Sequence, residues 1–172
     1  MFEIETRPVT TDKATLYAAL AGDLRALLEH EHDLIANAAN MASLIYHTLP
    51  GVNWAGFYFL KEGPPKEQPQ HGELVLGPFQ GKPACVRIAI GKGVCGTAAQ
   101  RRVSVVVPDV DAFPGHIACD SASRAELVVP IIQASRLLGV LDLDSPTPAR
   151  FDDIDREGCE TLVRIFVDSL AP

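Results

Sequence analysis

Three of the four cysteines fall in one stretch of the chain, between Gly77 and Ser123, among glycines, prolines and small residues. They are Cys85, Cys95 and Cys119. A cysteine that only fills a core usually stands within an apolar run, whereas these three stand at turns and at the starts of segments. Backbone amides are unpaired at such places and stabilise the thiolate, which is the nucleophilic form of cysteine. The pattern therefore predicts redox or nucleophilic chemistry.

Cys95 lies in the glycine-rich run GKGVCGTAAQ, which we expect to turn into a short helix near Gly93. The N-terminal end of a helix carries unpaired amides and a partial positive charge, which lower a thiol pKa from its usual value of about 8.5. The sequence thus predicts an activated thiol at Cys95. The alternative is a small residue packed at a tight turn.

The other cysteines differ in their surroundings. Cys119 follows His116 in the predicted loop GHIACDS, and a loop thiol near a histidine is a candidate nucleophile. Cys85 begins the run CVRIAI and, taken alone, is typical of an ordinary strand residue. Cys159 lies on the apolar side of the last predicted helix and is expected in the core.

Zinc binding is the competing use of these side chains. His116 and Cys119 form an HxxC pair, and Cys85 and Cys95 complete a set of four ligands. Structural zinc sites normally draw on close pairs such as CxxC, but ten positions separate Cys85 from Cys95 and twenty-four separate Cys95 from Cys119. The spacing favours redox chemistry, and we expect neither a metal nor a cofactor.

Acidic residues gather in a predicted hairpin over RAELVVPIIQASRLLGVLDLDSP. If the turn centres on Ser135, Glu126 faces Asp144 and Val128 faces Asp142. Side chains alternate along a strand, so the three carboxylates share one face of the hairpin. Like charges across a strand pair are destabilising, and the cluster therefore needs a cation. Either an arginine of the chain or the ammonium of a ligand would serve, and the arginine candidates are Arg87 and Arg124.

An aromatic strand is predicted over 52–60. Alternation turns Trp54, Gly56 and Tyr58 to one face and two phenylalanines to the other. Aromatic residues of a strand commonly belong to the core. Gly56 between two rings also leaves a hollow for a cation or an S-methyl group.

The order of predicted elements indicates an α+β fold in a single domain covering 1–172. Two helices, the first capped by Thr11 or Asp12, occupy about 12–49; the sheet occupies about 52–144; and a last helix occupies about 152–170. Within the sheet region, a polar, proline-rich loop over 61–72 follows the first strand. Long βαβ crossovers are missing, which favours an antiparallel sheet of about six strands with helices packed on one face. The strands after the first are predicted over 73–79, 85–90, 103–107, 125–132 and 138–144.

Composition excludes several classes of protein. The 172 residues carry a formal net charge of −7, which argues against nucleic-acid or anionic-membrane binding. No apolar run approaches the roughly 20 residues that span a bilayer. The acidic, polar start does not resemble a secretory signal, and a domain of this size does not need disulfides for stability. We therefore expect a cytoplasmic protein with reduced thiols.

Three long segments resemble the free methionine-(R)-sulfoxide reductases, which are built on a GAF domain. They are LVLGPFQGKPACVRIAIGKGVCGTAA, PDVDAFPGHIACDSASRAELVVP and GVLDLDSP. The resemblance covers nearly the whole chain; the longer 61–72 loop and the additional Cys159 depart from it. It implies a GAF fold, a homodimer, and reduction of free L-methionine (R)-S-oxide with regeneration by thioredoxin.

The resemblance also implies roles for individual residues. Cys119 would attack the sulfoxide sulfur, Cys85 would resolve the resulting sulfenic acid as a disulfide, and Cys95 would be a third thiol that helps to close or recycle the site. The carboxylates would hold the substrate and help to protonate its oxygen, with Asp144 among the catalytic groups. The residues expected to contact the substrate are Glu126, Asp142, Trp54, Tyr58, Ile117 and Ala118, the last two through backbone amides beside Cys119.

A non-enzymatic alternative has the same fold. GAF domains also serve as small-molecule or redox sensors, and such a sensor would use the same pocket without catalysis. Sensors usually adjoin an output domain, and the sequence shows none. The sequence therefore favours the enzyme.

Overall fold

Aspartates begin the three long helices of the chain. The computed structural model describes residues 12–61, 72–116 and 120–170. Asp12, Asp33 and Asp152 accept hydrogen bonds from first-turn amides of α1 (Lys13–Leu27), α2 (Leu34–Thr48) and α4 (Asp153–Ser169), the usual role of an N-cap carboxylate. The predicted helices are confirmed, with Asp12 as the first cap. No helix of the described part of the chain is long and apolar enough to cross a membrane.

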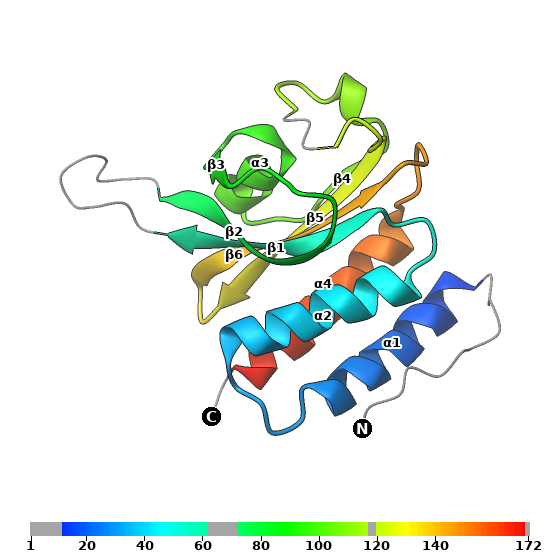
Figure 1. Ribbon diagram of the computed structural model, residues 1–172, viewed down its shortest axis with the longest axis vertical. Coiled ribbons are helices and arrows are strands. Elements are labelled where there is room, and N and C mark those ends of the chain that lie inside the picture. The colour runs from blue at the N-terminus through cyan, green and yellow to red at the C-terminus, as the bar shows by residue number, and fades with distance from the viewer. Residues whose placement is uncertain (1–11, 62–71, 117–119, 171–172) are drawn as a thin grey trace.

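The strands form one antiparallel sheet in the order β3-β2-β1-β6-β5-β4 (Figure 1). Their bounds are β1 (Trp54–Lys61), β2 (Glu73–Gly81), β3 (Arg87–Ala89), β4 (Val105–Val107), β5 (Ala125–Gln133) and β6 (Arg136–Ser145). The predicted α+β architecture is confirmed. The two edge strands β3 and β4 are shorter than the sequence predicted, so Cys85 precedes β3 instead of opening it.

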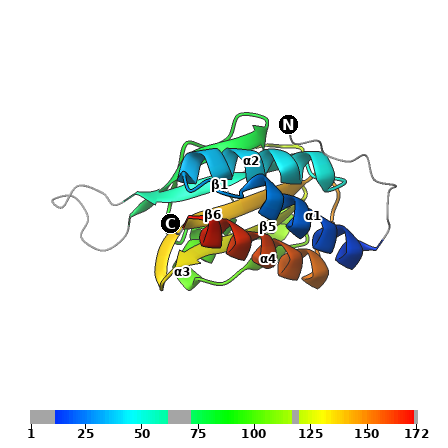
Figure 2. The same ribbon diagram turned by 90° about the horizontal axis from the view of Figure 1, so that it is seen from below.

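The two faces of the sheet carry different layers. On one face α2 and α4 cover a core that includes Phe57, Phe59 and Leu141, and α1 packs outside them, against both helices (Figure 2). On the other face, the short helix α3 (Gly93–Arg101) covers a second apolar cluster with Trp54 and Tyr58. The alternation predicted for the aromatic strand is thereby confirmed.

The β5–β6 hairpin has the facing pairs that the sequence predicted, reached in a different way. Ala134 and Ser135 form a two-residue turn with φ values of 45° and 69°, as a type I′ turn requires. The turn is centred between Ala134 and Ser135, half a residue before the predicted centre at Ser135. A bulge at Leu138 adds one residue to β6 and so restores the predicted pairing. Beyond the bulge, Glu126 faces Asp144 and Val128 faces Asp142.

A buried polar cluster joins α1 to α4. Asp155 is fully buried and accepts hydrogen bonds from Tyr17 Oη (3.0 Å), Arg150 Nη1 (2.9 Å) and Lys13 Nζ (2.5 Å). Cys159 lies beside this cluster, 3.7 Å from Tyr17 Oη, and is fully buried. Its predicted place in the core is confirmed.

Candidate active site

A pocket lies on the α3 face of the sheet, between α3 and strands β1, β5 and β6, and the segment 82–84 closes one side. It brings together most of the described residues that the sequence analysis selected. Those in its lining are Trp54, Tyr58, Cys95, His116, Glu126, Asp142 and Asp144. Ile117, Ala118 and Cys119 lie outside the described residues.

Strand register places the three carboxylates in this pocket. Glu126 and Asp144 are directly opposite each other on β5 and β6. Asp142 stands one pleat further along β6, two residues from Asp144 on the same face. Glu126 and Asp142 are each only 6% exposed, so the cluster is desolvated as well as crowded.

Of the two cations considered for this cluster, an arginine of the chain or a ligand ammonium, the structure does not support the arginine. Arg87 extends from the outer face of β3 and pairs with Glu73 of β2, and Arg124 pairs with Asp111. Both arginines therefore form ion pairs on the surface and not with the pocket carboxylates. Among the described residues, the one basic side chain found within ion-pair distance of the three carboxylates is His116, whose Nε2 lies 3.6 Å from Glu126 Oε2. Burial lowers the pKa of His116, so its imidazole is neutral at pH 7.

The pKa values of all three carboxyl groups are raised. Burial raises the pKa of Asp142 to about 7, although hydrogen bonds to Cys95 and Glu126 oppose the shift. Burial, and then the charges of Asp142 and Asp144, raise the pKa of Glu126 well above its ordinary value. Burial and the charge of Asp142 do the same to the pKa of Asp144. Each carboxyl group therefore keeps its proton to a higher pH than an exposed one, and the first ionisation in the cluster opposes the next.

Cys95 sits where the sequence predicted but with the opposite pKa shift. Helix α3 begins at Gly93, and the Cys95 side chain points to the sheet, with Sγ 3.9 Å from Glu126 Oε1. Burial, followed by the charges of Asp142 and Glu126, raises the pKa of this thiol well above its ordinary value. These two effects outweigh the helix N-terminus, so the predicted activation of Cys95 is wrong.

The hollow predicted above Gly56 is filled. A Cβ atom on Gly56 would lie 2.4 Å from Phe79 Cβ and 2.5 Å from Trp54 Cη2. The Trp54 indole lies across the glycine and stacks between Phe79 and Tyr58, at centroid distances of 5.4 and 5.9 Å. The missing side chain of Gly56 makes room for a tryptophan of the same strand, and the prediction of a ligand hollow there is wrong.

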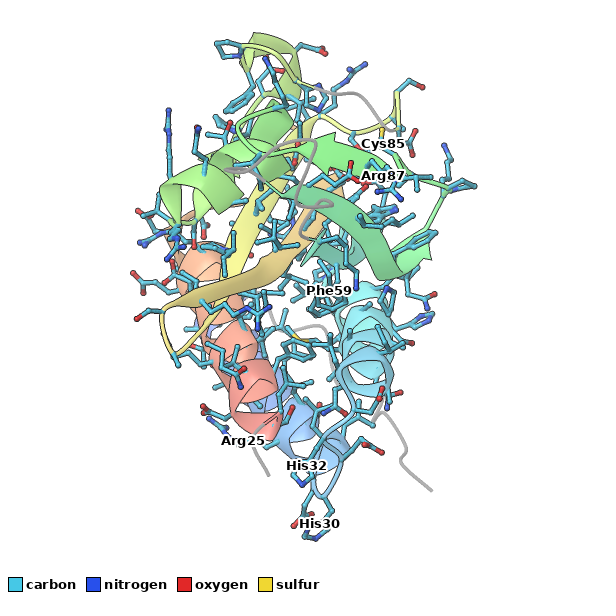
Figure 3. All side chains as sticks on the ribbon, turned by 90° about the vertical axis from the view of Figure 1, so that its left-hand side faces the viewer. Arg25, His30, His32, Phe59, Cys85 and Arg87 are labelled. Carbon is cyan, nitrogen blue, oxygen red and sulfur yellow. The ribbon has the colours of Figure 1, made fainter. Side chains whose placement is uncertain are left out.

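Trp54 and Tyr58 instead hold the segment that carries Cys85. Trp54 Nε1 donates to Lys82 O and Tyr58 Oη donates to Cys85 O, each at 3.0 Å. Cys85 is half-buried on the α3 side of the sheet, whereas Phe59 is on the opposite side toward α2 (Figure 3). The interpretation of Cys85 as an ordinary strand residue is wrong, because it lies in the connection before β3. Alternation along one strand could not reveal these contacts to another segment.

Several polar residues at the pocket were missed by the sequence analysis. Lys82 Nζ forms an ion pair with Asp120 at 3.2 Å, and Asn53 Nδ2 donates to Ser123 Oγ at 3.3 Å. Lys82, Asp120 and Ser123 line the pocket, and a hydrogen bond with Ser123 opposes the rise in the pKa of Asp144. The pair Asp120–Ser121 after Cys119 was the available signal, because Asp and Ser commonly form polar turns.

One group of side chains has the composition of a metal site. Cys95, Glu126 and Asp142 each offer a ligand atom, and these atoms lie within 4.8 Å of one another. The four zinc ligands considered from the sequence share only Cys95 with this group. A thiol and two carboxyl groups can also bind and protonate a polar ligand, which is the chemistry that the rest of the pocket supports.

Comparison with known proteins agrees with this architecture. The family model of the GAF domain matches residues 15–171, so the fold is that of a GAF domain. The chain is 53% identical over 171 residues to protein YtsP of Bacillus subtilis, covering 99% of each sequence. It is 46% identical to the free methionine-R-sulfoxide reductase of Escherichia coli, covering 88% of this chain and 87% of that one.

A solved structure extends the comparison. The free methionine-R-sulfoxide reductase of Neisseria meningitidis in complex with its substrate superposes with a TM-score of 0.88 at 40% identity, covering 99% of this chain and 96% of that one. The chain belongs to the free methionine-(R)-sulfoxide reductase family of GAF domains.

Proposed function

We propose that this chain reduces free L-methionine (R)-S-oxide to L-methionine. The observation that carries the proposal is the pocket cluster of Glu126, Asp142 and Asp144 beside the Cys95 thiol, in a chain that is 46% identical to the Escherichia coli reductase. Such a cluster combines acids with an anion in one water-poor pocket. Both are needed to bind an ammonium and to protonate an oxygen.

The carboxyl groups divide these two tasks. A sulfoxide oxygen leaves poorly until it is protonated, so an acid must stand beside the attacking thiol. Glu126 and Asp144, whose pKa values are raised by burial and by Asp142, supply that acid at neutral pH. Asp142, whose pKa is raised to about 7, supplies negative charge for the substrate ammonium.

The thiols perform the redox steps. The Cys119 sulfur attacks the sulfoxide sulfur, oxygen passes to Cys119, and methionine leaves with a sulfenic acid on the enzyme. The Cys85 thiol then condenses with the sulfenic acid, which forms a disulfide and releases one water. A thioredoxin dithiol reduces that disulfide and is itself oxidised. We assign resolution mainly to Cys85, because burial and nearby carboxylates hold the Cys95 thiol protonated. Cys95 remains the third thiol, which helps to close or recycle the site.

The remaining features of the proposal come from the family. The substrate carboxylate would accept hydrogen bonds from the amides of Ile117, Ala118 and Cys119. Trp54 and Tyr58 would wall the pocket and hold the Cys85 segment. The protein would act as a cytoplasmic homodimer and use no cofactor.

The test is thioredoxin-dependent oxidation of NADPH, with thioredoxin reductase present, after addition of free methionine (R)-sulfoxide. We expect turnover with the free amino acid. Binding of the sulfoxide without any turnover would instead identify a sensor domain.

Single-turnover measurements of cysteine variants test the assigned thiols. Cys119→Ser should release no methionine, because the thiol assigned to attack the sulfoxide sulfur is absent. Cys85→Ser should release one methionine per chain and stop at the sulfenic acid, which a dimedone-type probe would trap. The matched control is Cys159→Ser, whose thiol lies in the core between helices and should not affect the first turnover. Full single-turnover activity in Cys119→Ser would overturn the assignment.

A further inference from the structure

Three side chains of the pocket converge from three different elements. Cys95 of α3, Glu126 of β5 and Asp142 of β6 present ligand atoms within 4.8 Å of one another, and Cys95 Sγ is 3.9 Å from Glu126 Oε1. In a tetrahedral zinc site, bond lengths near 2.0 Å to oxygen and 2.3 Å to sulfur place such atoms about 3.5 Å apart. Small side-chain rotations would therefore close this group around one ion.

Asp142 supplies an independent sign that a ligand belongs here. Its side chain is almost fully buried, and Oδ1 has no hydrogen-bond partner. It projects from β6 between Val128 and Gly56, on the sheet face that α3 covers, and lines the pocket. A buried acceptor without a partner is costly, and a bound cation would satisfy it.

The donor set distinguishes between the cations that would fit. An ammonium pairs well with carboxylates but gains little from a thiol. A thiolate with two carboxylates suits a borderline-soft divalent ion such as Zn²⁺. Arg87 and Arg124 are engaged elsewhere and do not compete for these ligand atoms.

We propose that Cys95, Glu126 and Asp142 form a Zn²⁺ site, and that the bound ion inhibits the reductase by occupying the carboxylates that the substrate needs. On binding, the Cys95 S–H and Glu126 O–H bonds break, both protons pass to solvent, and S–Zn and O–Zn bonds form, with no change of oxidation state. Water completes the coordination. His116, 3.6 Å from Glu126 Oε2, stands where ligating carboxylates commonly have a supporting partner. The inhibition rests on the proposed function, whereas the binding does not.

Cobalt(II), a spectroscopic substitute for zinc, tests the binding. Titration of the reduced, metal-free protein should produce a thiolate-to-cobalt absorption band that one equivalent of Zn²⁺ abolishes. Cys95→Ser should remove the band, and Cys95→Ser and Asp142→Asn should each weaken Zn²⁺ binding at least tenfold, since even losing a supporting residue costs about 10–100-fold. The control Cys159→Ser should keep the band. A band that survives Cys95→Ser, or that is lost in Cys85→Ser or Cys119→Ser alone, would overturn the site.

Competition with the substrate tests the regulation. In Cys119→Ser, which cannot turn over, free methionine sulfoxide should weaken Zn²⁺ binding, whereas N-acetylmethionine sulfoxide should not. In the unaltered protein, Zn²⁺ should slow the first turnover and a chelator should restore it fully. An active reductase that is unaffected by saturating Zn²⁺ refutes the regulation and leaves the proposed function intact. A chain that binds cobalt through Cys95 but never reduces the sulfoxide refutes the proposed function and leaves the site intact.

Discussion

The three carboxyl groups of the pocket keep their protons to an unusually high pH. Glu126, Asp142 and Asp144 lie on one sheet face, where the pKa of Asp142 is raised to about 7 and the pKa values of Glu126 and Asp144 are raised well above their ordinary values. The cause is burial of all three, with the first ionisation opposing the next. One face thereby offers both an anion and a proton donor at the same pH.

Removing the acidic proton should slow the chemical step. Glu126→Gln and Asp144→Asn keep the shape of each side chain but cannot donate as acids, and general acid catalysis contributes about 10²–10⁴-fold. We expect the residue that protonates the sulfoxide to lose rate in this range, measured in a single turnover. Glu73→Gln is the matched control, because Glu73 pairs with Arg87 outside the pocket. Full first-turnover rates in both pocket variants would contradict acid catalysis by this cluster.

The same residues should restrict the substrate to the free amino acid. A peptide nitrogen carries no charge and would leave Asp142 unpaired in a buried site. Sites that bind a specific polar group reject analogues without it by about 10⁴-fold or more. The measurement compares kcat/KM for free and N-acetylated methionine sulfoxide. Similar values for the two would show that the carboxylates do not recognise the ammonium.

For single residues, the sequence predicted charge and the alternation of side chains along a strand, but it did not predict side-chain packing. The facing of Glu126 and Asp144 follows from the hairpin and was predicted correctly. The pKa of Cys95 was predicted in the wrong direction, because its burial depends on how α3 packs against two strands far along the chain. The prediction of an open hollow over Gly56 failed for a related reason, since Phe79 of β2 helps to fill that hollow.

At the level of helices and strands, the close contact between α1 and α4 depends on a residue without a side chain. Gly158 lies within α4, where a glycine normally weakens a helix. A Cβ atom there would lie 2.3 Å from the ring of Tyr17 on α1, whose hydroxyl donates to buried Asp155. The glycine lets α1 approach closely enough for that hydrogen bond. Helix periodicity predicted both helices but could not identify this contact.

Two glycine substitutions should therefore have opposite effects on stability. Gly22 lies within α1, and a Cβ atom there meets nothing within 4 Å. Gly22→Ala should stabilise the protein by about 0.5–1 kcal/mol, the usual gain in a helix interior. Gly158→Ala should destabilise it by about 1–3 kcal/mol, as overpacking does. Urea unfolding measures both, and equal gains would show that α1 does not pack closely on Gly158.

For the molecule as a whole, the pocket carboxyl groups affect folding as well as catalysis. The folded-state pKa of Asp142 is about 7 against an ordinary value of 3.8. Between these pH values the unfolded chain gives up a proton that the folded chain retains, so stability falls as pH rises through this window. The active site thus opposes folding at neutral pH.

Asp142→Asn should reverse this effect in a pH-dependent way. The amide cannot ionise, so the variant should gain little relative to the parent near pH 4 and progressively more up to about pH 8, reaching a few kcal/mol at most. Thermal unfolding with a chelator present measures the difference. Glu73→Gln, a change of an exposed carboxylate, provides the control. A difference that does not grow with pH would contradict the raised pKa.

The sheet that separates the two apolar clusters also has an evolutionary consequence. Phe57 and Leu141 contact the helices, whereas Trp54 and Asp142 on the same two strands face the pocket. Substitutions that share no contacts have nearly additive effects on stability. A lineage can therefore change the ligand side of this scaffold one position at a time, while the helix side provides the stability that offsets the accumulating losses of stability. One architecture can thereby acquire new specificities.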